Sequence, residues 1–162
     1  MAQLFDEVRQ GRSRRLTLAP MSAFTQGEID YLHGQLLARM ATVGPDGQPH
    51  LIPVTYVFNE EQDAIDVGGI DFASGKKWRD AQQNPRVTLL VDDSPGPGQA
   101  RAIEIRGQVE LHTTGGEKIN RRFPTFVPEF FRLRPTKIVS WGLGAGEADV
   151  PEGGFPPYSR SV

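Results

Sequence analysis

The sequence contains no cysteine among its 162 residues. This absence excludes disulfide bonds, thiolate catalysis and zinc sites with sulfur ligands, and it is consistent with a reducing cytoplasm, where we expect the protein to act. The sequence also lacks the run of about 18 to 20 apolar residues that a membrane-spanning helix needs. Residues 1–15 mix acidic and basic side chains before any apolar run, unlike a secretory signal. We therefore expect neither export nor membrane insertion.

Signature motifs of several enzyme classes are missing as well. The sequence has no GxSxG, no P-loop and no GxGxxG, so nucleophilic hydrolysis and Rossmann dinucleotide binding lack their usual markers. His33, His50 and His112 show none of the short ligand spacings that metal sites use, and we expect them to have surface or packing roles. Because the sequence identifies no catalytic side chain and no metal site, a bound cofactor would have to supply the reactivity.

The overall charge and composition limit the partners and the number of domains. The formal net charge of −2 gives no general attraction for nucleic acid, so we expect no nucleic-acid partner. Hydrophobic residues make up 38% of the chain and charged residues 23%, which is typical of a soluble globular protein. The length fits one domain. We expect an N-terminal arm at 1–20, a cofactor-binding domain at 21–143 and a Gly/Pro-rich tail at 144–162, with too little apolar content to pack alone.

Short apolar segments between turn residues predict a mainly β fold. The Pro-Asp-Gly turn within residues 44–49 joins two strands into a hairpin. Short strands joined by tight turns favour an antiparallel barrel over a parallel sheet, which would need longer helical crossovers. The expected strands are residues 37–44, 50–59, 64–70, 86–93, 100–112 and 136–143.

The same pattern leaves room for only a few helices. The first is expected from a cap at Ser22 or Thr25 to about residue 35, and Glu28 stands at the capping-box position for Thr25. A second helix is expected from a cap at Ser74 to about residue 83, where Asn-Pro ends it. Residues 113–131 are expected to form a further helix that is broken at its prolines.

The segment around Ser74 carries the most informative local charge pattern. Lys76, Lys77 and Arg79 lie close together directly after an expected strand and at the start of an expected helix. Free backbone N–H groups and the positive end of the helix dipole would add to these cations and make a phosphate site. A basic run is also typical of a solvated helix face, and spacing alone leaves both interpretations open.

Two further features could bring a flat ligand close to the strands. Gly68 and Gly69 end an expected strand, where glycine either permits close approach of a ligand or marks a bulge. Pro53 lies inside another expected strand and cannot donate to its ladder, which favours an edge, a bulge or an open rim.

Five segments of the sequence resemble, in the right order, the pyridoxamine-5′-phosphate-oxidase-like FMN-binding split-barrel superfamily. They are residues 38–59, 64–70, 74–93, 103–110 and 137–143. They are most similar to its actinobacterial branch of oxidoreductases that depend on the deazaflavin coenzyme F420. The resemblance implies a six-stranded antiparallel split β-barrel and an obligate homodimer, with the cofactor in a cleft between the subunits.

The resemblance also implies which residues contact the cofactor. One strand lines the ring, two glycines form a close-approach turn after the next strand, and a basic run contacts the phosphate. The implied cofactor-binding residues are Ile52, Pro53, Val54, Thr55, Tyr56, Val57, Gly68, Gly69, Ser74, Lys76, Lys77 and Arg79.

The sequence departs from the true pyridoxamine-phosphate oxidases at two positions. Those enzymes carry an arginine and a lysine where this sequence has Ile52 and Val57, which weakens the case for FMN and for a pyridoxal-type product. The deazaflavin branch accepts apolar residues there, so coenzyme F420 is the expected cofactor and FMN the alternative. The expected function is hydride transfer between coenzyme F420 and an unsaturated small molecule, with Tyr56, His50 or water as proton donor. The alternatives are an FMN-dependent oxidoreductase and a non-catalytic protein that binds flavin, deazaflavin or haem.

Overall fold

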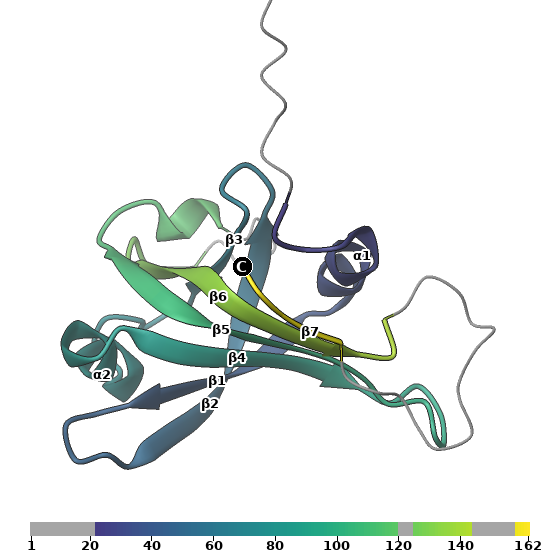
Figure 1. Cartoon of the computed structure of the whole chain (residues 1–162). Coiled ribbons are helices and arrows are strands. Elements are labelled where there is room, and N and C mark those ends of the chain that lie inside the picture. Colours follow the sequence, from purple (N-terminus) through teal and green to yellow (C-terminus); the bar gives the residue numbers. More distant parts are fainter. Residues whose placement is uncertain (1–21, 120–124, 144–157) are drawn as a thin grey trace, which may run out of the picture.

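The computed structural model describes residues 22–119, 125–143 and 158–162 (Figure 1). The N-terminal arm expected at residues 1–20 and most of the tail expected at 144–162 lie outside the described residues. The described elements, in chain order, are α1 (Gln26–Gly34), β1 (Leu37–Val43), β2 (Pro49–Asn59), β3 (Ala64–Gly68), α2 (Lys76–Gln83), β4 (Arg86–Asp93), β5 (Arg101–His112), the short 3-10 helix η1 (Gly116–Lys118), β6 (Phe130–Trp141) and β7 (Tyr158–Ser161).

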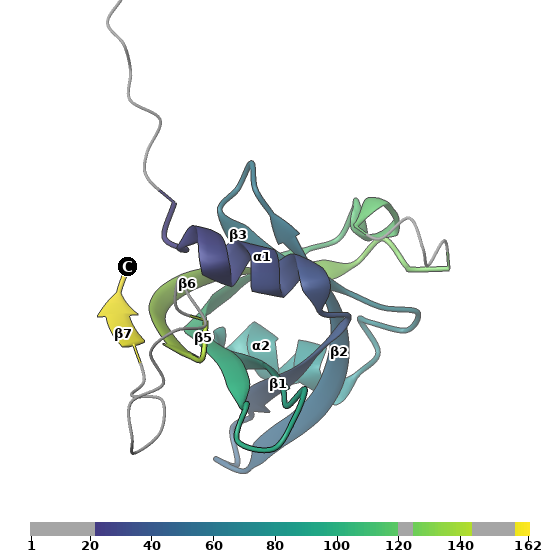
Figure 2. The ribbon, with the colours of Figure 1, turned by 90° about the vertical axis from the view of Figure 1, so that its right-hand side faces the viewer.

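Six strands close into an antiparallel barrel. They follow the order β3-β2-β1-β4-β5-β6, and an additional pairing between β3 and β6 joins the two ends of the sheet. The helices α1 and α2 lie at opposite ends of this barrel, as Figures 1 and 2 both show. The expected fold class, a mainly β six-stranded split barrel, is therefore confirmed.

The barrel interior is filled by alternate residues of each strand. On β2, the buried side chains are Val54, Tyr56 and Phe58, whereas the residues between them keep some exposure. This alternation is what a strand with one face on the core requires. The sequence period therefore decides which side chains of β2 face the core and which face outward.

Aromatic side chains attach α2 to the end of the barrel. The ring of Trp78 stacks on that of Phe131 at a centroid distance of 5.2 Å and an interplanar angle of 5°. Phe72, just before the helix, meets Phe131 edge-on at 4.8 Å. All three rings are buried. Because aromatic side chains bury large areas, this cluster holds the start of α2 in one place.

The capping box expected for the first helix is present. Thr25 is the N-cap: its hydroxyl accepts a hydrogen bond from the Glu28 backbone N–H, and the Glu28 carboxylate accepts one from the Thr25 backbone N–H at 2.9 Å. Ser22, the alternative cap, donates its hydroxyl to Asp63 instead. Reciprocal bonds of this kind satisfy two of the donors that a helix start leaves open.

The helix expected at residues 113–131 is wrong for the described part of that segment. Only the 3-10 helix η1 forms there, residues 120–124 lie outside the described residues, and β6 already begins at Phe130. The reason lies in the alternation of the chain after Pro128, since Phe131 and Leu133 face the core while Arg132 and Arg134 face outward. That is the period of a strand.

The end of the chain packs as well, although its sequence has little apolar content. Residues of β7 pair with Lys137–Ser140 of β6. They use the same edge of β6 that pairs with β3 at residues 131–133. Arg160 donates from Nη1 to Glu28 at 2.9 Å and from Nε to the carbonyl of Ala23 at 3.0 Å. Main-chain pairing and one ion pair thus replace the apolar contacts that the tail lacks.

This ion pair is buried on the side of α1. Glu28 is only 1% exposed. Burial alone would raise the pKa of the Glu28 carboxyl, but hydrogen bonds from Arg160 and from the Thr25 backbone outweigh it and hold that pKa below its ordinary value. The ionised Glu28 therefore depends on Arg160 as its counter-ion.

Replacing Arg160 by alanine should lower the free energy of unfolding by about 3 to 5 kcal/mol, because Glu28 would keep a buried charge without its partner. Denaturant unfolding measures the change. Arg86→Ala is the matched control, since Arg86 is exposed and hydrogen-bonds to Asn84 only two residues away; its effect should stay within about 0.5 kcal/mol. Equal effects of the two substitutions would contradict a stabilising role for the Arg160 pair.

Candidate functional site

The start of α2 differs in one respect from the sequence expectation. The N-cap is Gly75, with no side-chain hydrogen bond, so the expected cap at Ser74 is wrong. Ser74 lies one residue further out and is exposed, and its carbonyl accepts a hydrogen bond from the guanidinium of Arg79. Glycine at this position leaves the first backbone N–H groups of the helix without a side-chain cap, free to meet an anion.

The three cations of this segment have different surroundings. The Lys76 ammonium donates to both carboxylate oxygens of Asp80, at 2.8 and 3.0 Å. Arg79 is exposed and turns back to Ser74. The Lys77 ammonium lies over the ring of Phe72, 4.4 Å from its centroid. The three charges are therefore adjacent in sequence but not equivalent in structure.

Lys77 is a half-buried cation at the start of α2. Burial lowers the pKa of its ammonium, and the nearby charge of Asp71 opposes this shift only in part. Within the described residues, no carboxylate forms an ion pair with Lys77. An anionic ligand would stabilise a partly buried ammonium beside a helix start, because it would provide a counter-ion that the described residues do not provide.

The strand expected to line the cofactor ring divides into two sets of side chains. Val54 and Tyr56 are buried inside the barrel and Ile52 packs against the same core. Pro53, Thr55 and Val57 alternate with them on the outer face. The inward residues can therefore meet a ligand outside the barrel only through their backbone, and the outer face presents no charged side chain at residues 53, 55 and 57.

Tyr56 is not available as a proton donor to a ligand outside the barrel. Its buried hydroxyl donates to the carbonyl of Leu32 at 2.8 Å, and burial raises the pKa of Tyr56. His50 keeps partial exposure, although its Nδ1 atom is buried and has no hydrogen-bond partner among the residues that the structure describes.

The two glycines at the end of β3 are accounted for by rings of this chain. A Cβ atom on Gly68 would lie 3.0 Å from the ring of Phe126, and one on Gly69 would lie 3.3 Å from the ring of Phe72. Gly68 pairs with Thr55 across the strands, so both lie on the outer face beside the segment that carries Phe126. Close approach by aromatic side chains thus explains these glycines without a ligand.

The sequence prediction missed the charged pairs that frame the site. Asp66 and Arg132 pair across β3 and β6 at 2.7 Å, next to Val57 on the outer face. Asp80 joins α2 to β1 by accepting a hydrogen bond from Thr42 at 2.9 Å. The sequence held a signal for each pair. Asp66 stands inside an otherwise apolar strand, and Asp80 follows a lysine by four residues.

Residues 22–119, 125–143 and 158–162 contain no cluster of three or more His, Asp or Glu side chains that could hold a metal ion. No helix within these ranges is both long and apolar enough to cross a bilayer.

Comparison with known proteins agrees with the split-barrel architecture. The profile of the pyridoxamine 5′-phosphate oxidase family matches residues 27–123. A protein of Streptomyces rimosus subsp. rimosus, named 5a,11a-dehydrotetracycline/5a,11a-dehydrooxytetracycline reductase, is 39% identical over 132 residues, which are 80% of this chain and 89% of that protein.

Solved structures also share the fold of this chain. An F420 reductase matches with a TM-score of 0.51 and 28% identity over 64% of this chain and 88% of its own. An FAD-binding protein from Mycobacterium smegmatis shares the fold, with a TM-score of 0.54 and 20% identity over 74% of this chain and 96% of its own. With the family profile matching more than half of its length and a reductase aligned over 80% of it, the chain belongs to the pyridoxamine 5′-phosphate oxidase family and is an oxidoreductase of that family.

Proposed function

We propose that this protein is a reductase that uses coenzyme F420 to transfer a hydride to an unsaturated small molecule. The observation that carries the proposal is the Lys77 ammonium, which is partly desolvated and has no ion-pair partner among the described residues, at the uncapped start of α2. A phosphate group on the cofactor supplies the missing counter-charge.

The residues of the site fit a phosphorylated ring cofactor. Lys77, Arg79 and Ser74 would hold the phosphate, and the outer face of β2 would meet the ring through Pro53 and Val57. When bound in its reduced form, a deazaflavin supplies the hydride, so that the protein needs no nucleophile of its own. The chain contributes binding energy and orientation, which together lower the barrier by holding the reactants in one geometry.

Two of the comparisons support this choice of chemistry. The name of the Streptomyces relative describes reduction of a dehydro compound, which fits an unsaturated substrate. The other is an F420 reductase, at 28% identity. The apolar residues Ile52 and Val57, where the resemblance places an arginine and a lysine in the true oxidases, also favour a deazaflavin over FMN.

A protein that binds FMN, deazaflavin or haem without turnover is the second candidate. The observation in its favour is the position of Tyr56, whose hydroxyl is bound to Leu32 and cannot deliver a proton to the outer face. A carrier needs no such donor, whereas a reductase would take its proton from water, because His50 lies on the same side of β2 as Tyr56.

Reconstitution of the purified protein separates these candidates. We expect coenzyme F420 to bind more tightly than FMN in fluorescence titrations. Reduced cofactor in the complex should be reoxidised when a polycyclic dehydro compound is added, as followed by its absorption spectrum. Binding without reoxidation by any unsaturated acceptor would indicate a carrier, and tighter binding of FMN would identify a flavin enzyme.

Replacing Lys77 by alanine should weaken cofactor binding about tenfold to a hundredfold, because a charge-assisted contact worth roughly 1.5 to 3 kcal/mol is lost. The dependence of affinity on salt should also decrease. Lys137→Ala, which removes a lysine on β6, is the control and should leave affinity unchanged. If Lys77→Ala binds both cofactors as tightly as the wild type, Lys77 is an ordinary helix residue.

We propose that the protein forms the homodimer that the family resemblance implies. The apolar residues of β3 and β4, such as Ile65, Val67 and Leu89, are buried within a single chain. Of the six exposed large apolar side chains in the described residues, three lie on or beside β1 and β2: Leu36, Leu37 and Leu51 are 62%, 59% and 65% exposed. Large exposed apolar side chains on one face mark an interface.

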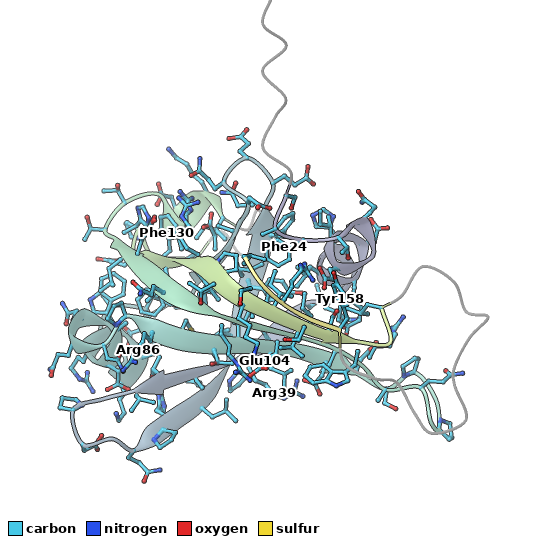
Figure 3. All side chains as sticks on the ribbon, viewed as in Figure 1. Phe24, Arg39, Arg86, Glu104, Phe130 and Tyr158 are labelled. Carbon is cyan, nitrogen blue, oxygen red and sulfur yellow. The ribbon has the colours of Figure 1, made fainter. Side chains whose placement is uncertain are left out.

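Charged side chains lie on the same outer face as Leu37 and Leu51. Arg39 stands between the registers of these two leucines and pairs with Asp92 of β4. Figure 3 labels Arg39 and Glu104 of β5, whose strands are separated by β4. The face therefore combines apolar and charged side chains, as protein interfaces do.

Replacing Leu51 by lysine should therefore convert a dimer into a monomer, because two charges would meet across a symmetric contact. Multi-angle light scattering at micromolar concentration measures the mass. Ile70→Lys serves as the control for an exposed apolar residue on another part of the chain. A wild-type protein that is monomeric at this concentration would rule out a cofactor cleft shared between subunits.

A further inference from the structure

A buried polar cluster lies directly beneath the start of α2. Asp80 is 3% exposed. Its carboxylate accepts hydrogen bonds from the Lys76 ammonium at 2.8 and 3.0 Å and from the Thr42 hydroxyl at 2.9 Å. The cluster therefore ties the first turn of the helix, where Lys76 lies, to strand β1, where Thr42 lies.

The cluster is closely packed from the side of the first hairpin. A Cβ atom on Gly44 would lie 2.6 Å from the Asp80 carboxylate and 3.2 Å from the Lys76 ammonium. His50 stands opposite Thr42 in the β1–β2 ladder and acts on Asp80 through its charge when protonated. The first hairpin therefore packs directly against the Asp80 carboxylate and the Lys76 ammonium.

The charge state of the cluster follows from this geometry. Burial alone would raise the pKa of Asp80, but hydrogen bonds from Lys76 and Thr42 and the charge of Lys76 outweigh burial and hold that pKa below its ordinary value. Asp80 is thus ionised at neutral pH. If Lys76 swung out to a ligand, it would leave this carboxylate buried without a counter-ion, which is costly.

We propose that Asp80 sets the charge of the phosphate site: it holds Lys76 as an internal counter-ion, so that Lys77, and not Lys76, meets the cofactor phosphate. This proposal rests on the proposed function, because it requires a phosphorylated cofactor at this helix start. Asp80 is then a positioning residue that acts through Lys76. The two adjacent lysines have separate roles, one internal and one for the ligand.

The proposal predicts a specific pattern when the two charges are removed singly and together. The contribution of the phosphate is measured as the ratio of affinities for two matched ligand pairs: FMN against riboflavin, and the deazariboflavin 5′-phosphate part of coenzyme F420 against the same deazariboflavin without its phosphate. In the wild type this ratio should favour the phosphorylated ligand by about tenfold or more, as for one charge-assisted contact. Lys77→Ala should bring it close to one.

The variants at Asp80 and Lys76 should move the ratio in opposite directions. Asp80→Asn leaves Lys76 uncompensated and should raise the ratio by about threefold, the size expected of one partly screened charge. Lys76→Met leaves Asp80 uncompensated and should lower the ratio and the melting temperature. The double variant Lys76→Met/Asp80→Asn removes a neutral pair and should restore the ratio to within about twofold of the wild type.

The same titrations contain the results that would overturn the proposal. If the double variant loses the preference for phosphate as fully as Lys77→Ala does, Lys76 is a direct ligand. If Lys76→Met leaves the melting temperature unchanged, Asp80 does not depend on it. If the wild type does not distinguish the phosphorylated ligands from the phosphate-free ones, the proposed function itself fails and the assignment of Lys77 fails with it.

Discussion

Closure of the sheet between β3 and β6 is the constraint on which the rest of the structure depends. Three residue pairs join the two strands. One of them, Asp66 with Arg132, is also an ion pair with an N–O distance of 2.7 Å. Closure fixes Phe131 inside the barrel, and its ring stacks on Trp78. Because Trp78 belongs to the first turns of α2, the closing strand also determines where that helix begins. The position of Lys77 thus depends on the packing of Trp78 against Phe131 of the closing strand.

Most of the barrel could be predicted from the sequence, because a strand with one buried face shows a period of two. The same rule failed at β6, where the prolines before Phe130 and two adjacent phenylalanines obscured the alternation that Phe131 and Leu133 continue. It failed again at β7, whose stability comes from the free edge of β6 and from Arg160 meeting Glu28 across 132 residues of sequence. Neither partner is visible in a local window.

The candidate site was predictable in outline but not in its division of roles. The pattern of β2 identifies two alternating sets, yet both are mostly apolar, so the sequence could not say that Tyr56 faces the core and Thr55 faces outward. Likewise the basic run shows its charges but not their partners. Asp80 follows Lys76 by four residues, a spacing usual for exposed helix pairs, and only the packing against β1 makes that carboxylate a buried one.

These partners decide how much positive charge the helix start offers to a ligand. With Lys76 paired to Asp80, the local field comes from Lys77, from Arg79 and from the open N–H groups of α2. The outward residues Pro53, Thr55 and Val57 of β2 carry no charge themselves, whereas Arg39 stands opposite Pro53 and the ion pair of Asp66 with Arg132 lies beside Val57. Charges placed near a flavin ring tune its electronics, whereas a neutral strand leaves the ring's own chemistry in control. If the cofactor lies as proposed, Lys77 and Arg79 would hold its phosphate at one end, and the uncharged residues of β2 would contact the ring at the other, where the reduced cofactor supplies the hydride.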